Sequence, residues 1–247
     1  MVSTLGLIGS GMIGGALARL AVAAGLDVVL SNSRGPETLA DLVTELGPNA
    51  RAATPSEAAR AGDLVVATIP LHAYEQLPVD ALTGKIVIDT MNYYPQRDDR
   101  IPLLDSNELT SSSMVQGHLA GSRVVKVCNN IDFRRLQTLA RPTGAADRSA
   151  LPLAGDDASA RSEVARLLST LGYDTVDIGT LADSWRSEPG TPVYVQPYFP
   201  EQPPTDLGPE AAFHWFMQTP GTAVARRRIE ELTSTAVRGV AGGRFPA

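Results

Sequence analysis

The sequence predicts an α/β protein whose core is a doubly wound, mostly parallel Rossmann sheet, with a smaller C-terminal region. Short β-branched apolar runs recur along the chain, helical segments separate them, and a glycine-rich turn follows the first run. The runs are apolar nearly throughout, which is typical of strands buried on both faces. We expect strands at 2–8, 27–31, 63–69, 85–89, 123–127, 150–154 and 173–178, and a weaker one at 51–53.

Helical patterns occupy most of the intervals between these strands. In the segment 55–61, Thr54 is a suitable N-cap, Pro55 occupies the first helical position and Glu57 supplies an acidic first turn. We expect helices at 12–24, 36–46, 55–61, 105–117, 131–139 and 157–171. Strands that alternate with helices in this way indicate a parallel sheet.

The character of the sequence changes after about residue 183. The segment 188–209 is rich in proline and aromatic residues, a composition that excludes regular structure. The segment 209–238 reads as one final helix, and its aromatic residues suggest a docking or dimer-forming element. We therefore divide the chain of 247 residues into a dinucleotide-binding domain at 1–130 and a smaller α/β region at 131–247.

Net charge, cysteine count and the length of apolar runs limit the kinds of partner that we expect for this protein. The formal net charge of −6 gives no reason to expect a nucleic-acid surface. Cys128 is the sole cysteine, so no disulfide closes within the chain, and it reads as buried filler. The N-terminus lacks the pattern of a signal peptide, and no apolar run approaches the roughly 20 residues that cross a bilayer. We expect a cytoplasmic homodimer without a membrane partner or a metal site.

The glycine-rich turn, "GLIGSGMIGGALA" at 6–18, predicts a dinucleotide site. Gly9-Ser10-Gly11-Met12-Ile13-Gly14 matches G-x-G-x-x-G between an expected strand and an expected helix. Gly9 permits the tight turn, Gly11 lets backbone approach the pyrophosphate, and Gly14 with Gly15 lets the helix pack closely on the sheet. The helix N-terminus then presents free N–H groups and a partial positive charge to the phosphates.

The end of the second strand favours NADP(H) over NAD. An NAD site places an Asp or Glu there to bind the ribose hydroxyls. Here the chain reads Ser31-Asn32-Ser33-Arg34, without a carboxylate. Hydroxyl and guanidinium donors suit the dianionic 2′-phosphate, which Arg can bind through two hydrogen bonds.

Three further strand ends are candidates for the nicotinamide and hydride-acceptor site. They are Thr68-Ile69-Pro70-Leu71-His72, Asp89-Thr90-Met91-Asn92 and Cys128-Asn129-Asn130. Reacting groups collect beyond the carboxyl ends of the strands in such a sheet. Asn92 and Asn129 could hydrogen-bond a carboxamide or an acceptor ring, although capping of strand-end backbone explains them equally well. His72 could donate a proton, or be a loop histidine without a chemical role.

These segments together resemble the NADPH-dependent coenzyme F420 reductase family and the cytosolic reductase domain of the STEAP ferric reductases. The resemblance rests on "SNSRGPETL", "VVATIP", "GKIVIDTMN" and "VVKVCNNI", with the glycine-rich turn. The later stretch "GDD…LGYDTVDIGTLADSW" resembles bacterial members, so the likeness covers about residues 2–195.

The resemblance implies hydride transfer between NADP(H) and a deazaflavin (coenzyme F420) or a flavin (FMN or FAD). It implies three groups of site residues: Ser10, Met12 and Ile13 at the pyrophosphate; Ser31, Ser33 and Arg34 at the 2′-phosphate; and Ile69, Pro70, Asn92 and Asn129 around the nicotinamide. The loop "IPLHAY" departs from the family's "IPWEH"-type loop and shifts His72 by one position.

The sequence leaves several classes of hydride acceptor open. Both lysines, Lys85 and Lys126, lie in or beside apolar strands and look structural, which favours a ring that stabilises incoming charge itself. Tyr74, His72 or His118 stay open as acids for an imine or carbonyl substrate. A non-catalytic NADP(H) sensor is a further alternative. The candidate aromatic walls of an acceptor cleft are Trp185, Tyr194, Tyr198 and Phe199.

Overall fold

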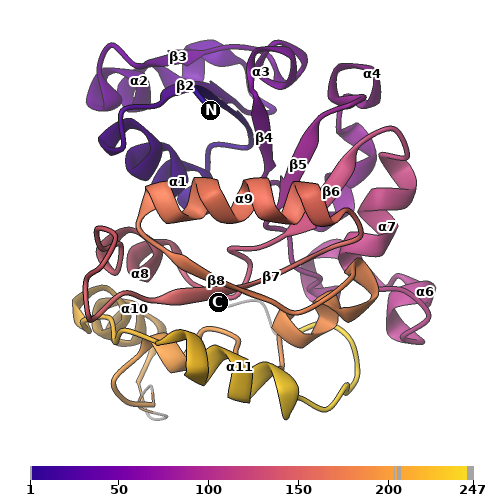
Figure 1. Cartoon of the computed structure of the whole chain (residues 1–247), viewed down its shortest axis with the longest axis vertical. Coiled ribbons are helices and arrows are strands. Elements are labelled where there is room, and N and C mark those ends of the chain that lie inside the picture. Colours follow the sequence, from indigo (N-terminus) through magenta and orange to yellow (C-terminus); the bar gives the residue numbers. More distant parts are fainter. Residues whose placement is uncertain (1, 203, 205–206, 244–247) are drawn as a thin grey trace.

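The computed structural model describes residues 2–202, 204 and 207–243, and it contains the predicted α/β fold (Figure 1). Eight strands form one sheet in the order β3-β2-β1-β4-β5-β6-β7-β8, and every neighbouring pair is parallel except β6 and β7. All eight expected strands are confirmed. They are β1 (Thr4–Ile8), β2 (Asp27–Ser31), β3 (Ala50–Ala52), β4 (Leu64–Ala67), β5 (Ile86–Asp89), β6 (Arg123–Lys126), β7 (Ala150–Gly155) and β8 (Asp174–Asp177).

Helices cover both faces of this sheet, as the doubly wound architecture requires. Those of the N-terminal half are α1 (Met12–Ala23), η1 (Pro36–Leu39), α2 (Ala40–Leu46), α3 (Pro55–Ala61), η2 (Leu71–Gln76), α4 (Val79–Leu82), α5 (Pro95–Asp98), α6 (Pro102–Asp105) and α7 (Ser111–His118). Those that follow are α8 (Phe133–Thr138), α9 (Ala158–Leu171), η3 (Leu181–Ser187), η4 (Gln196–Tyr198), α10 (Pro209–Gln218) and α11 (Arg226–Ser234).

The alternate side chains of each central strand divide between two apolar cores. Leu5 and Leu7 of β1 point into the core shared with α1, α8, α9 and α11. Val65 and Ala67 of β4 point into the opposite core, which α4, α6 and α7 help to close. Because both faces are buried, every residue of β4 and β5 is buried, which explains the continuous apolar runs.

The sheet continues without interruption past residue 130. The β6–β7 contact pairs Val125 with Gly155 and Lys126 with Ala154 in antiparallel register. Strand β8 then adds in parallel after the crossover helix α9, which passes over the sheet in Figure 1. The division at residue 130 stays a prediction, since both halves contribute strands to one sheet.

Two expected helices differ from the structure. The segment 105–117 is helical only from Ser111, because Asn107 adopts a positive φ of 61° and Thr110 caps the helix through the Ser113 N–H. The segment 209–238 is two helices, α10 and α11, rather than one. Pro220, just past the end of α10, has no N–H and cannot continue it.

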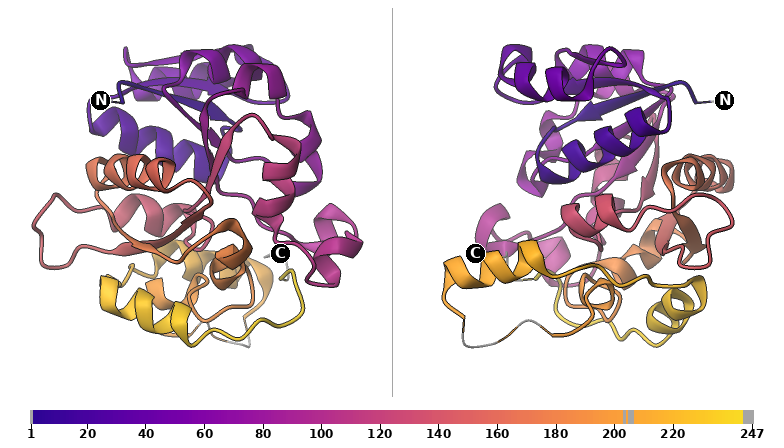
Figure 2. Two further views of the ribbon diagram at one scale, coloured as in Figure 1. Left: turned by 45° about the vertical axis from the view of Figure 1, so that its right-hand side comes forward. Right: turned by 90° about the vertical axis from the view of Figure 1, so that its left-hand side faces the viewer.

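The proline-rich segment packs on the body of the protein. Among its described residues, η4 and Pro209 at the start of α10 are helical, so the prediction that this composition excludes regular structure is wrong at η4. Its Val193 and Tyr198 are fully buried. Figure 2 shows α10 and α11 at the lower end of the molecule, below α8. No helix among the described residues is long and apolar enough to cross a membrane.

Candidate cofactor and acceptor site

The glycine-rich turn lies between the carboxyl ends of β2 and β4. Gly9 has a φ of +100°, and its N–H donates to the Ser31 carbonyl at 3.0 Å. A Cβ at Gly9 would stand 2.3 Å from the Thr68 carbonyl oxygen. Glycine is therefore required there by both backbone conformation and space, as the motif predicts.

The other glycines of the motif have distinct roles. A Cβ at Gly14 would stand 2.3 Å from the Gly9 carbonyl oxygen, so the first turn of α1 packs directly on the loop. Gly15 does not share this role, since its nearest neighbour would be the flexible end of Arg19. A Cβ at Gly11 would have no neighbouring atom within 4 Å, so the surface of this glycine is open to a ligand.

The N-terminus of α1 has the features of an anion site. Gly11 caps the helix without a side-chain hydrogen bond, and the first turn contains no acidic residue. Met12 is 65% exposed there, while Ile13 is half-buried and packs on the core. The Ser10 hydroxyl donates to the Ser31 carbonyl at 3.0 Å, which fixes the loop against β2. The uncapped N–H groups and the helix dipole therefore suit a pyrophosphate.

The end of β2 presents fewer donors than the sequence suggests. Ser31 is fully buried and its hydroxyl donates to the Leu7 carbonyl at 2.8 Å, so its expected contact with the 2′-phosphate is corrected to a structural role. The Asn32 side chain bonds Thr38 and accepts from the Arg34 N–H, which shapes the loop. Ser33 and Arg34 are exposed, and they are the side chains placed to meet a phosphate.

The predicted nicotinamide residues lie at the adjoining strand ends. Ile69 packs beside Gly9, where its Cγ2 would be 3.1 Å from an added Cβ, and Pro70 lies at the start of η2, where it is exposed. The Asn92 side-chain amide donates to the Asn129 carbonyl at 2.8 Å, and Asn129 donates back to the Asn92 side-chain oxygen at 3.1 Å. Asn129 also donates to the Ser187 carbonyl. The two asparagines thus tie the ends of β5 and β6 together.

His72 joins this group through residues that the sequence analysis did not single out. Its Nδ1 lies 3.0 Å from Asp98 Oδ1, and its side chain is 48% exposed. Arg97 donates to both carboxylate oxygens of Asp98 and to the Asn92 carbonyl at 2.8 Å. The structure therefore brings His72, Asn92 and Asn129 into one hydrogen-bonded chain. In the sequence, the signal for this hydrogen-bonded chain is the charged pair Arg97-Asp98, which follows the end of β5.

A buried ionic network stabilises the same strand ends from below. Lys126, fully buried, lies 3.4 Å from Asp89 and 3.2 Å from the Ser111 hydroxyl, and it also donates to the Met91 carbonyl. Ser111 in turn donates to Glu188 at 2.7 Å. Lys85 donates to the Gly62 carbonyl at the opposite end of the sheet. Both lysines are structural, as predicted.

Cys128 and the candidate aromatic walls are mostly core residues. Burial raises the pKa of the Cys128 thiol to about 12, which makes it inert as a nucleophile. Tyr198 is fully buried and donates to the Ala150 carbonyl, so it is corrected from cleft wall to core. Phe199 is buried and stacks on Trp215 of α10, while Trp185 packs under the guanidinium of Arg186. Tyr194 shares a hydrogen bond with Tyr94.

Comparisons with known proteins agree with this geometry. The family model described as NADP oxidoreductase coenzyme F420-dependent matches residues 4–93, which run from β1 to the Asn92 end of the site. This N-terminal part of the chain is therefore similar to NADP-dependent oxidoreductases. Its matched segment contains the glycine turn, the β2 end and the β4 end described above.

Similar proteins include a metalloreductase and two solved structures. The chain is 29% identical to Metalloreductase STEAP3 of Rattus norvegicus over 73% of its length, but spans only 34% of that protein. A hypothetical protein, SMa0349 of Sinorhizobium meliloti, is 30% identical with a TM-score of 0.68, over 78% of this chain and 93% of that one. A structure from Arthrobacter sp. FB24, described as a putative F420-dependent NADP-reductase, shares the fold: it is 22% identical with a TM-score of 0.63, over 74% of this chain and 87% of that one.

Proposed function

We propose that this protein transfers a hydride between NADP(H) and a deazaflavin such as coenzyme F420, or a flavin. The observation that carries the proposal is the carboxylate-free end of β2, with exposed Ser33 and Arg34, beside the uncapped N-terminus of α1. Donors at both places suit the phosphates of NADP(H). The match of residues 4–93 to the NADP oxidoreductase family model supports this choice of cofactor.

The residues of this chain would mainly position the cofactor. Gly11 leaves room for the pyrophosphate, and α1 supplies N–H groups to it. When bound, NADPH supplies the hydride at its nicotinamide ring. Asn92, held in place by the buried Asn129, borders the ring where the ends of β5 and β6 meet. This rigid pairing restricts the orientation of a nicotinamide ring that stacks there.

The contacts of the two lysines support the choice of acceptor. Both lysines are committed to carbonyl and carboxylate partners, so neither is available to protonate a ketone or imine. A flavin or deazaflavin disperses incoming charge in its own ring and depends less on a strong acid. This supports a flavin-type acceptor.

An imine or carbonyl reductase is the second candidate, and His72 is the observation that favours it. Its half-exposed ring, paired with Asp98, is well placed among the described site residues to donate a proton to a substrate nitrogen or oxygen. The binding of NADPH without turnover of any acceptor would indicate a sensor instead.

Anaerobic NADPH oxidation distinguishes these possibilities. Coenzyme F420, FMN and FAD are supplied separately, with NADH as the control donor, and absorbance of the reduced nicotinamide is followed. We expect rapid reduction of one acceptor with NADPH and much slower reduction with NADH. NADPH binding without oxidation by any of the three would reject the proposal and direct the search to imines and ketones.

A further inference from the structure

The pair formed by His72 and Asp98 has the geometry of an oriented proton donor. His72 lies on η2, directly after the β4 end, and Asp98 is the last residue of α5, which follows the β5 end. The His72 backbone N–H and ring Nδ1 both approach Asp98 Oδ1, at 3.3 and 3.0 Å. These two contacts fix both the backbone and the ring of His72.

Asp98 is built to remain an anion. Its side chain is fully buried, and it accepts from Arg97 through both oxygens and from the Tyr94 N–H at 2.9 Å. Burial alone would raise the pKa of this carboxyl, but the hydrogen bonds from Arg97, Tyr94 and His72 hold the pKa below its usual value. An ionised Asp98 can only accept from His72, so Nδ1 carries a proton.

This arrangement leaves the other ring nitrogen available. Among the residues that the structure describes, none bonds His72 Nε2, and almost half of the side chain is exposed. Arg97 extends the same network to the Asn92 carbonyl at 2.8 Å, so the pair is linked to the proposed nicotinamide border. A buried carboxylate that orients a histidine in this way fixes its tautomer and the direction of its other ring nitrogen.

We propose that Asp98 is a positioning residue that holds His72 as the proton donor to the hydride acceptor. The inference rests on the proposed function, because a flavin or deazaflavin takes up a proton together with the hydride when it is reduced to its neutral form. In the step, the hydride leaves NADPH with two electrons and forms a bond to the acceptor, while Nε2–H of the His72 cation gives its proton to the acceptor. The products are NADP⁺, the reduced neutral acceptor and neutral His72, which takes a new proton from water.

The surroundings of His72 add few competing charges. Asp98 faces it from α5, and Arg97 of the same helix pairs with Asp98. On η2 itself, Tyr74 bonds Glu75 rather than His72, and its ring contacts His118 of α7 edge-on. Asp98 is thus the carboxylate in direct contact with the imidazole.

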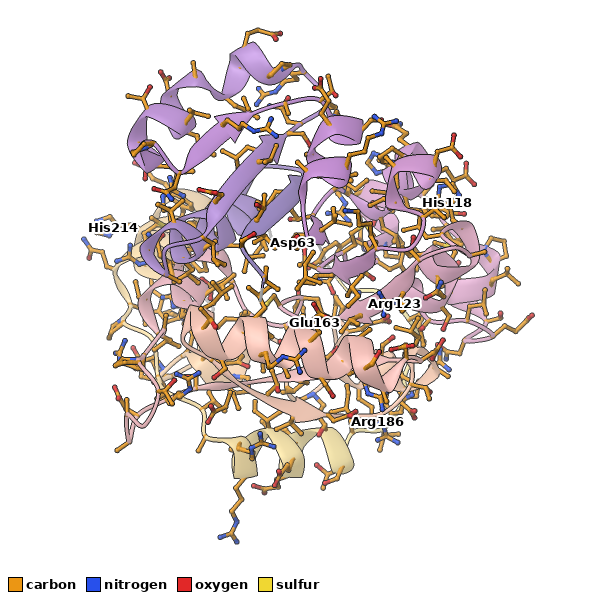
Figure 3. The ribbon with its side chains drawn as sticks, turned by 45° about the horizontal axis from the view of Figure 1, so that its top comes forward. Asp63, His118, Arg123, Glu163, Arg186 and His214 are labelled. Atoms are coloured by element: carbon orange, nitrogen blue, oxygen red, sulfur yellow. The ribbon has the colours of Figure 1, made fainter. Side chains whose placement is uncertain are left out.

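The tautomer is tested by long-range ¹H–¹⁵N NMR on the whole protein. The chain has three histidines, so His→Gln variants assign each signal. Figure 3 shows His118 and His214 on opposite sides of the molecule, and His214→Gln serves as the control variant. We expect neutral His72 to carry its proton on Nδ1, and Asp98→Asn to shift the proton towards Nε2. A wild-type proton on Nε2 would overturn the proposal.

Single-turnover hydride transfer from NADPH tests the role in catalysis. His72→Gln should slow the step about 100-fold, which is within the range typical of a positioned acid. This variant should also lose the fall in rate at alkaline pH. Asp98→Asn should slow the step and change its pH profile, and Asp98→Glu should restore part of the rate. NADPH affinity should change less than about twofold in His72→Gln, because the proton donor acts on the acceptor.

The possible failures are distinguishable. If the wild type turns over and His72→Gln is equally fast with the same pH profile, this inference is overturned and the proposed function stands. Wild-type protein that binds NADPH and reduces no acceptor would overturn both. Loss of stability in Asp98→Asn with an unchanged tautomer and pH profile would assign Asp98 a purely structural role.

Discussion

At the scale of single residues, the motif glycines separate into those that the fold needs and one that the ligand needs. Gly9 and Gly14 face carbonyl oxygens that a Cβ would overlap, whereas Gly11 faces open space. These roles follow from the sequence motif. The motif does not show that a Cβ at Gly15 would meet only the flexible end of Arg19. The burial of Ser31 was also not predictable, because its hydroxyl turns inward to a neighbouring strand's carbonyl.

Gly11→Ala should therefore weaken NADPH binding without unfolding the protein. A methyl group there displaces the pyrophosphate from the backbone, and a lost charge-assisted hydrogen bond is worth about 1.5–3 kcal/mol, or about 10- to 100-fold in affinity. Titration calorimetry and thermal melting measure the two effects. Gly117→Ala, an equally open glycine in α7, is the matched control. Unchanged NADPH affinity in Gly11→Ala would contradict the assignment.

At the level of helices and strands, the local sequence pattern predicts where the strands and their neighbouring helices lie. It does not predict the two C-terminal helices. Apolar runs and the Thr54 capping box locate their elements because the signals are local. What holds α10 in place is non-local: Arg135 of α8 is fully buried and donates to the carbonyls of Phe216 and Thr219. Its guanidinium also lies 4.0 Å from the Phe199 ring centroid. A sequence offers no signal for such a contact.

Arg135→Met should loosen α10 and lower the free energy of unfolding by about 1–3 kcal/mol, because buried carbonyls lose their donor. Urea unfolding followed by tryptophan fluorescence is informative, since Trp215 lies on α10 and stacks on Phe199. Arg134→Met is the control and should change stability by less than about 0.5 kcal/mol. If the two variants were equally stable, Arg135 would not anchor α10.

At the scale of the whole molecule, the order of the first six strands and the position of the cofactor site follow from the βαβ pattern. Ligands bind beyond the carboxyl ends of the strands in such sheets, so Asn92, Asn129 and His72 could be grouped from sequence. The chain that connects them through Arg97 and Asp98 depends on how η2 and α5 pack, which no local pattern encodes. The homodimer stays a prediction.

In the proposed function, the end of β2 selects NADP(H) over NAD(H) through Arg34. The most direct measurement is the affinity of the wild-type protein and of Arg34→Ala for NADPH and for NADH, by fluorescence titration. We predict that the wild type prefers NADPH and that Arg34→Ala loses about 10- to 100-fold in NADPH affinity, with NADH affinity nearly unchanged. Equal binding of the two nucleotides by the wild type, or an equal loss of both in the variant, would contradict the account.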